Sequence, residues 1–391
     1  MHIASWTRDL RQGGKTGWEV HYEASKQADG DADVIMLSIG EHDFDTPEPI
    51  VDACIGALRD GQHHYTNAGG IAPLLAAIAD REQDITGVRT TPANVIAQSG
   101  AQGALFSAAL SVADPHDEII IVEPHYVTYP ATMRATGAKV VTVGCDADHD
   151  FAVSPDAIAA AVTENTSLIL INTPNNPTGA VYPRDTLEAI AEICRQRDIW
   201  LMSDEVYSDF CYDADFVHPR ALKGMADRTI VVSSLSKSYA MTGWRMGWAI
   251  APEPLIEAMN DISLVMHYGL PEFIQTAAVS AFADHTIADR IVNRYRARRD
   301  LFIAALAEEG FQAHTPAGGM NVMLDLRALN RSSEDICWQL LKEEKVSVLP
   351  GDGFGPSAKG FVRISFCNHE DKLAEAAHRI GRFLRRQGLN G

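Results

Sequence analysis

The sequence Ser233-Ser-Leu-Ser-Lys-Ser-Tyr-Ala-Met-Thr-Gly-Trp-Arg-Met-Gly-Trp248 places one lysine, Lys237, among hydroxyl groups and glycines. The apolar run Thr229-Ile-Val-Val232 precedes it, which predicts a buried strand that leads into a serine-rich turn. A lysine amine attacks an aldehyde only when unprotonated, so its ordinary pKa of about 10.4 has to be lowered by burial or nearby positive charge. Arg245 is a candidate for that charge. The pattern indicates a nucleophilic lysine, although an isolated lysine is usually a solvated surface residue.

Length and composition set the class of protein. A chain of 391 residues with 46% hydrophobic residues exceeds what one core usually holds, so we expect a large and a smaller domain. The formal charge of -19 argues against nucleic acid or an anionic membrane as a partner. Six dispersed cysteines without a C-x-x-C pair favour reduced thiols. With neither a signal pattern nor an apolar run of about 18 residues, the sequence predicts a soluble cytoplasmic protein.

Short apolar runs alternate with helical stretches through the middle of the chain. This alternation predicts a doubly wound α/β sheet, because parallel neighbouring strands need helical crossovers. The runs span residues 95–98, 118–123, 139–143, 168–172, 200–203, 229–232 and 246–250.

Both ends of the chain differ from this middle part. After about residue 284 a long helix (287–309) precedes strands at 321–326, 346–349 and 361–366, a helix at 336–344 and a terminal helix, which suits a small α/β domain. The first 33 residues are polar and are expected to be irregular. Gly13-Gly14-Lys15-Thr16 is similar to the end of a phosphate-binding loop, but Asp9 stands where the motif needs glycine and no buried strand precedes it, so no nucleotide site is expected.

Ordered motifs from Gly40 to Arg363, together with the lysine segment, resemble the aspartate aminotransferase superfamily of pyridoxal-phosphate enzymes, fold type I. One is Glu41-His-Asp-Phe-Asp-Thr-Pro47, which matches the family's G-E-P-D-F-x-T-P segment with His42 in place of the usual proline. The resemblance implies a large cofactor-binding domain (46–283) with a seven-stranded, mostly parallel sheet. Its smaller α/β domain would be formed from both termini (1–45 plus 284–391).

The resemblance also implies a cradle for the cofactor phosphate. The segment 99–105 opens a helix after a strand, so free N–H groups and the helix dipole favour an anion there. The implied cradle comprises Gly100, Ala101, Gln102, Ser234, Ser236 and Arg245.

Further residues would act on the cofactor ring. Asp204, in Ser203-Asp-Glu-Val-Tyr207, matches the carboxylate that keeps the ring nitrogen protonated. Asn176, in Asn175-Asn-Pro-Thr-Gly179, and Tyr207 match the donors to the phenolic oxygen, and Tyr126 matches the aromatic residue stacked on the ring. Lys237, Asp204 and Tyr207 are thus the implied catalytic residues.

The resemblance names substrate contacts and a partner as well. Gly40, Asn176 and Arg363 would contact the amino acid, with the Arg363 guanidinium gripping its α-carboxylate. Tyr65 would reach from one subunit to the cofactor phosphate in the other, which implies a homodimer. His63 and His64 lack a further ligand at suitable spacing, so no metal site is expected.

The implied activity is amino-group transfer between an L-amino acid and a 2-oxo acid by a ping-pong mechanism, with Lys237 forming a Schiff base with pyridoxal phosphate and then shuttling a proton. Gln102 stands where aspartate- and prephenate-using relatives commonly carry a lysine that pairs with the distal carboxylate, and Asn321 replaces a frequent phenylalanine. An uncharged or broadly tolerated donor is favoured, although Lys15 leaves aspartate open. Two alternatives are a C–S β-lyase with the same motifs and a ligand-sensing regulatory protein, which would usually carry an added basic DNA-binding module.

Overall fold

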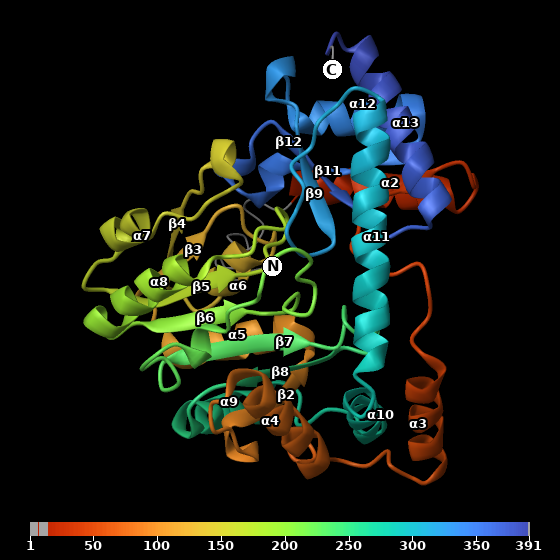
Figure 1. The fold of residues 1–391 in the computed structure, drawn as a ribbon. Coiled ribbons are helices and arrows are strands. Elements are labelled where there is room, and N and C mark those ends of the chain that lie inside the picture. Colours follow the sequence, from red (N-terminus) through yellow and green to blue (C-terminus); the bar gives the residue numbers. More distant parts are fainter. Residues whose placement is uncertain (1–6, 8–14, 390–391) are drawn as a thin grey trace, which may run out of the picture.

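The computed structural model describes residue 7 and residues 15–389. A seven-stranded sheet with the order β2-β8-β7-β6-β5-β3-β4 forms its centre (Figure 1). All neighbouring strands are parallel except that β8 is antiparallel to both β2 and β7. Each predicted run coincides with one strand, so the predicted fold class is confirmed. The strands are β2 Val95–Ser99, β3 Glu118–Val122, β4 Lys139–Val143, β5 Thr166–Asn172, β6 Trp200–Asp204, β7 Thr229–Ser234 and β8 Met246–Ile250.

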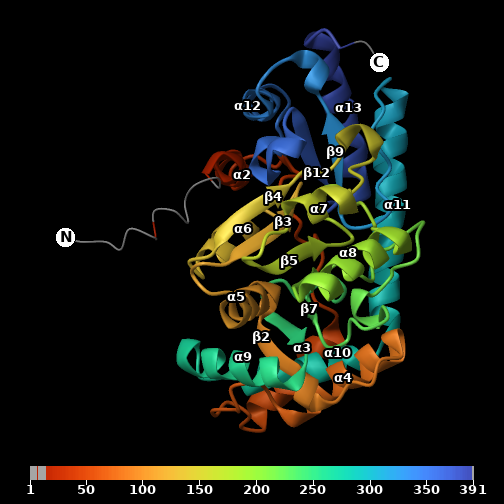
Figure 2. The ribbon, with the colours of Figure 1, turned by 90° about the vertical axis from the view of Figure 1, so that its left-hand side faces the viewer.

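Helices cover both faces of this sheet, as Figure 2 shows. On one face a core of buried apolar side chains lies under α5 (Gly100–Val112), α6 (Tyr129–Arg134) and α9 (Glu253–Met266). On the other face a second core lies under α7 (Pro155–Ala161) and α8 (Arg184–Arg197). Burial on both faces explains why strands such as β3 and β5 are almost continuously apolar rather than alternating.

The register of the parallel strands brings their carboxyl ends together. Asn172, the last residue of β5, lies opposite Asp204, the last residue of β6, and Asp204 lies opposite Val232 in β7. Loops that leave these strand ends therefore meet at one edge, where doubly wound sheets commonly bind ligands.

Two smaller sheets lie beyond that edge. One has the order β11-β12-β9 and is antiparallel, and the other pairs β1 with β10 in parallel, so the start of the chain joins its last third. The long helix α11 (Thr286–Glu308) runs past the large sheet to these strands (Figure 1). The division into residues 46–283 and the two terminal parts stays a prediction. The strands are β1 Ile35–Met36, β9 Asn321–Asp325, β10 Val346–Ser347, β11 Leu349–Pro350 and β12 Phe361–Ser365.

The remaining helices complete the layers. Next to the β2 side of the large sheet, α10 (Glu272–Phe282) packs on α3 (Glu48–Arg59) and α4 (Ala72–Thr86), and α12 (Ser333–Glu344) and α13 (Glu370–Arg386) cover the small sheets. Short 3-10 turns are η1 Pro92–Asn94, η2 Ala147–His149, η3 Pro219–Ala221, η4 Arg327–Leu329, η5 Gly351–Phe354 and η6 Pro356–Ala358.

One expectation about the N-terminal segment is wrong. Residues Lys15–Ala28 form a helix, α2, rather than irregular chain. Val20 and Ala24, four residues apart on one face, are completely buried, and α2 packs on α12 and β11. Most residues of this segment are polar, so the short apolar face does not stand out as a helical pattern in the sequence. Gly13 and Gly14 and the side chains of Lys15 and Thr16 lie outside the described part of the chain.

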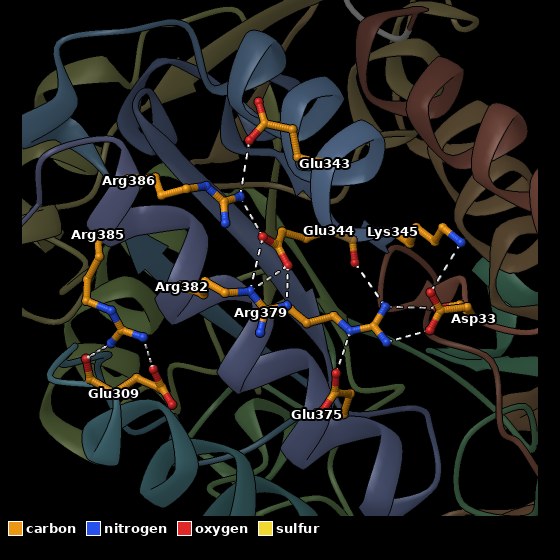
Figure 3. A network of polar contacts seen from close by, with 10 residues as sticks. All are labelled: Asp33, Glu309, Glu343, Glu344, Lys345, Glu375, Arg379, Arg382, Arg385 and Arg386. Carbon is orange, nitrogen blue, oxygen red and sulfur yellow. Dashed lines mark hydrogen bonds and ion pairs between the residues drawn. The ribbon is translucent and has the colours of Figure 1, made fainter.

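A network of ion pairs fixes α13 (Figure 3). The carboxylate of Glu344, at the end of α12, accepts hydrogen bonds of 2.5 Å from both Arg382 and Arg386. Arg379 donates to the Glu344 carbonyl oxygen and to Asp33, ahead of β1. Arginines on one helix thus connect α12, α13 and the segment before β1.

Several general features complete the description. All six cysteines are unpaired. No helix among the described residues has the length and apolar character needed to cross a membrane. Within the same residues, no three His, Cys, Asp or Glu side chains are grouped to hold a metal ion.

Candidate active site

A cavity of about 280 Å³ opens at the carboxyl ends of β3, β5, β6 and β7. Twelve predicted site residues line it: Gly40, Ala101, Gln102, Tyr126, Asn176, Asp204, Tyr207, Ser234, Ser236, Lys237, Arg245 and Arg363. Predicted residues from the first and last parts of the chain thus meet predicted residues from the large sheet. Gly100 lies behind Arg245, and Tyr65 does not line the cavity.

Lys237 projects into this cavity from the loop between β7 and β8. Its Nζ donates a hydrogen bond of 2.5 Å to the carbonyl oxygen of Gly40. Burial lowers the pKa of Lys237, and the positive charges of Arg363 and Arg245 act in the same direction. A lowered pKa is what a nucleophilic amine needs.

Asp204 ends strand β6 with its carboxylate buried in the cavity wall. Its Oδ2 accepts a hydrogen bond of 2.5 Å from the Tyr129 hydroxyl, and its Oδ1 accepts one of 3.1 Å from the Val206 amide. Burial raises the pKa of Asp204 to about 6, although both hydrogen bonds oppose this. A buried carboxylate with this environment is well suited to pair with a cationic ring nitrogen.

Two neighbours of Asp204 were not predicted from the sequence. Tyr129 starts α6, one helical turn after Tyr126, and this spacing was the available signal. Asn172 donates to the Asp204 carbonyl oxygen at 3.0 Å and accepts from the Asn176 amide at 2.8 Å. Its position at the end of a buried strand, just before the Asn-Asn-Pro-Thr-Gly segment, was the signal there. Asn172 therefore ties the loop that carries Asn176 to the strand that carries Asp204.

Arg363 lies in the middle of β12 and is almost completely buried. Its Nη2 donates to the Ser38 carbonyl oxygen at 2.6 Å, and its Nη1 donates to Asn176 Oδ1 at 3.3 Å. Among the described residues, its Nε atom has no hydrogen-bond partner and no carboxylate forms an ion pair with its guanidinium. A buried guanidinium without an acidic partner is costly unless an anion binds to it.

The start of α5 forms an anion cradle with the β7–β8 loop. A Cβ atom on Gly100 would overlap Nη2 of Arg245, so the guanidinium lies directly against the first residue of the helix. A Cβ atom on Gly247 would lie 2.5 Å from the carbonyl carbon of Gly100, so β8 also contacts this turn closely. Free helix N–H groups, the Ser234 hydroxyl and a guanidinium together suit a phosphate group.

Gln102 belongs to the same helix turn, but its amide is already engaged. Its Nε2 donates to Thr132 Oγ1 at 2.7 Å, and its Oε1 accepts from Thr128 Oγ1 at 2.8 Å. The neutral side chain at the position where aspartate- and prephenate-using relatives commonly carry a lysine is thus held by two threonines.

The model of the family "Aminotransferase class I and II" matches residues 32–380. The chain belongs to this family. Aminotransferases of this family depend on pyridoxal phosphate, and the phosphate cradle, the buried Asp204 and the amine of Lys237 fit that cofactor.

Individual aminotransferases are similar over nearly their full length. An arginine–pyruvate transaminase of Pseudomonas aeruginosa is 41% identical over 382 residues, which cover 97% of each chain. An aspartate/prephenate aminotransferase of Thermus thermophilus is 34% identical over 358 residues, covering 90% of this chain and 92% of that protein. The structure of a Thermus thermophilus aspartate aminotransferase with maleate matches with a TM-score of 0.92 at 32% identity, over 98% of this chain and 100% of that chain. The activity is thus that of a pyridoxal-phosphate-dependent transaminase, and the similarities favour it over the C–S β-lyase and regulatory alternatives.

Proposed function

We propose that this aminotransferase attaches pyridoxal phosphate to Lys237 and that the residues of the same cavity divide the work of amino-group transfer. The observation that carries the proposal is the meeting of three charged groups in one cavity: the Lys237 amine, the buried Asp204 carboxylate and the unpaired Arg363 guanidinium. Bound pyridoxal phosphate supplies an electron sink for the bonds at the substrate α-carbon.

Cofactor binding follows from the surrounding donors. Arg245, the Ser234 and Ser236 hydroxyls and the amides of Gly100, Ala101 and Gln102 would hold the phosphate at the start of α5. Asp204 would pair with the ring nitrogen. Asn176 and Tyr207, which line the same cavity, would donate to the phenolic oxygen, and Tyr126 would stack on the ring.

Lys237 moves the proton. Once the amino acid has taken the place of Lys237, the freed Nζ would accept the proton from the substrate α-carbon and would later give a proton back to complete amino-group transfer. Burial lowers the pKa of Lys237, which favours the unprotonated amine that a base must be. Arg363 meanwhile binds the α-carboxylate, with Gly40 and Asn176 beside it, and orients the α-carbon toward Nζ.

The charges around the cavity favour a donor with an uncharged or cationic side chain. Gln102 is neutral, while Glu41 lines the cavity, accepts a hydrogen bond of 3.0 Å from Thr242 and forms no ion pair within the described residues. A carboxylate on the donor side chain would be repelled by the Glu41 charge, and the neutral Gln102 would offer no positive charge to compensate. The name of the Pseudomonas relative makes arginine and pyruvate the first donor and acceptor to test.

A panel of donors tests this proposal. Arginine, alanine and aspartate are added separately to the holoenzyme without acceptor, and the loss of the visible cofactor band is followed in time. Arginine or alanine should bleach the band faster than aspartate. In the Glu41→Gln variant, bleaching by arginine should be slower, whereas the rate of bleaching by alanine should stay the same. Fastest bleaching by aspartate would contradict the proposed donor class.

We also propose that the enzyme works as a homodimer. The Tyr65 side chain is 87% exposed and packs edge-on against Tyr268, 5.1 Å between ring centroids, on a surface away from its own cavity. A second copy of the chain would cover this ring and receive its hydroxyl near the phosphate cradle.

Subunit mixing tests the shared site. Homodimers of Tyr65→Ala or of Lys237→Ala should each have little or no transaminase activity. A mixed dimer would contain one site that carries neither substitution. Activity should therefore return after denaturation and refolding of the mixture. A monomer in sedimentation experiments, or a mixture no more active than its parts, would contradict the proposal.

A further inference from the structure

Two buried side chains, Tyr295 and Cys367, and the partly buried His42 form a chain of contacts behind Lys237. The hydroxyl of Tyr295, on α11, lies 2.9 Å from Nδ1 of His42. The thiol of Cys367, just after β12, interacts with the same hydroxyl. Tyr295 is completely buried, and its ring stands edge-on to the His42 ring at 5.3 Å between centroids. None of the three residues was predicted to be part of the site.

His42 connects this chain of contacts to the lysine. It lies two residues after Gly40, whose carbonyl oxygen holds Lys237 Nζ at 2.5 Å. The imidazole also interacts with the backbone of Ser236 and Lys237 on its other side. His42 thus contacts both the segment that carries the acceptor, the Gly40 carbonyl oxygen, and the segment that carries the donor, Lys237 Nζ. A residue in this position controls the distance between the two segments.

The imidazole is held in its neutral form. Burial and the positive charge of Lys237 lower the pKa of His42 to about 4, although Asp43 and the backbone carbonyl groups of Ser236 and Lys237 oppose this. With its proton at Nε2, the neutral ring can accept at Nδ1 from the Tyr295 hydroxyl, and Nε2 makes no hydrogen bond of full geometry among the described residues. The histidine thus fixes the turn without placing a second cation beside the amine.

We propose that His42 and Tyr295 are a pair of positioning residues for Lys237. The phenol orients the imidazole, the imidazole fixes the turn from Gly40 to His42, and the Gly40 carbonyl then holds Nζ in place. This inference rests on the proposed role of Lys237. It assigns a function to the histidine that replaces the proline of the usual motif, because proline has no side-chain acceptor for Tyr295.

Variants of the pair separate positioning from simple packing. Tyr295→Phe removes the hydroxyl, His42→Phe removes the acceptor, and His42→Asn keeps an acceptor close to the position of Nδ1. Tyr212→Phe is the matched control, because this buried hydroxyl donates to the Gly319 carbonyl oxygen at 2.6 Å and does not line the cavity.

Two measurements on the holoenzymes report on the lysine. The first is kcat and KM with ordinary and α-deuterated donor. The second is the visible cofactor absorbance of the substrate-free enzyme from pH 5 to 9. Tyr295→Phe and His42→Phe should lower kcat about tenfold or more at nearly constant KM, raise the deuterium isotope effect and shift the absorbance midpoint. His42→Asn and Tyr212→Phe should resemble the wild type in all of these.

An unchanged isotope effect and an unchanged absorbance midpoint in both His42→Phe and Tyr295→Phe would overturn the inference, whatever their melting temperatures. If Tyr295→Phe fails to fold, the comparison of His42→Asn with His42→Phe decides. Reduction with borohydride separates this outcome from failure of the proposed function. If the cofactor adduct is on Lys237 but the variants show wild-type isotope effects and absorbance midpoints, only the positioning role is contradicted. An adduct on another residue would contradict both the positioning role and the proposed function of Lys237.

Discussion

The hydroxyl of Tyr129 donates a hydrogen bond of 2.5 Å to Oδ2 of Asp204, and the described residues provide no other side-chain donor to this carboxylate. The bond stabilises the ionised form of Asp204, while burial raises its pKa to about 6. A cationic ring nitrogen is stabilised only by the ionised carboxylate. Affinity for the cofactor should therefore fall as the pH is lowered through about 6.

Tyr129→Phe should move this loss of affinity to higher pH. Without the phenol the pKa of Asp204 should rise, because a hydrogen bond to a charged group stabilises the ionised form by about 1.5–3 kcal/mol. Binding of pyridoxal phosphate to the cofactor-free wild type and variant, measured at several pH values between 5 and 8, gives the shift. Protonation changes of the free cofactor affect both proteins equally and therefore cancel. Superimposable curves would show that Tyr129 does not act on Asp204.

Arg363 should be needed for activity but not for stability. Arg363→Met removes a buried guanidinium that forms no ion pair within the described residues, so the free energy of unfolding should stay constant or rise by about 1–2 kcal/mol. The kcat/KM for the amino donor should fall about 30-fold or more, because a lost buried charge pair with the α-carboxylate costs about 2 kcal/mol or more.

Urea unfolding without substrate and steady-state kinetics measure these two effects. Arg363→Lys serves as the comparison, since it keeps the charge but loses the planar fork. A clearly destabilised Arg363→Met protein would mean that the arginine belongs to the folding core rather than to the substrate site.

Gly247→Ala should impair the phosphate cradle. Its Cβ would lie 2.5 Å from the Gly100 carbonyl carbon, so β8 and the start of α5 have to separate, at a cost of about 1–3 kcal/mol. Gly243→Ala, in the loop just before β8, is the matched control, because no atom of the described residues other than its chain neighbours lies within 4 Å of its Cβ position. Equilibrium dialysis should show weaker cofactor retention for Gly247→Ala alone. Equal retention by both variants would argue against a tight cradle at Gly100.

Glu344 should stabilise the docking of α13. Its side chain is only 5% exposed and bonds to Arg382 and Arg386, so Glu344→Gln should lower the free energy of unfolding by about 1–3 kcal/mol. Glu343→Gln, 40% exposed with one contact to Arg386, should change it by less than about 0.5 kcal/mol.

The pH dependence of this contribution has a defined sign. Burial opposes ionisation of Glu344, but hydrogen bonds from Arg382 and Arg386 outweigh it and hold its pKa below the usual value. The stabilisation is therefore complete above the unfolded-state pKa of about 4.3 and is lost at lower pH. The two glutamine variants should converge in stability in acid, and a constant difference from pH 7 to pH 3 would refute the assignment.

The large sheet was predictable because its strands are short apolar runs, and all of them except the edge strand β4 are mostly buried. The meeting of Asp204, Asn176 and Lys237 was predictable for a related reason, since residues that follow parallel strands gather at one edge. Helix α2 was not, because only Val20 and Ala24 mark its buried face and the packing partners come from the far end of the chain.

Partnerships between side chains were the least predictable. Nothing in the sequence around Tyr129 says that its hydroxyl reaches Asp204, 75 residues away. The contact of His42 with Tyr295 spans 253 residues. Such pairs depend on how α6 and α11 pack rather than on any local pattern.

The position of the cofactor linkage is the most direct test of the central claim. Holoenzyme reduced with borohydride and digested should give one pyridoxyl-bearing peptide, with the label on Lys237 of the segment Ser233–Trp248. Lys237→Ala, treated in the same way, should carry no label there and should not exchange amino groups. A label on another lysine, or full turnover by Lys237→Ala, would contradict the account.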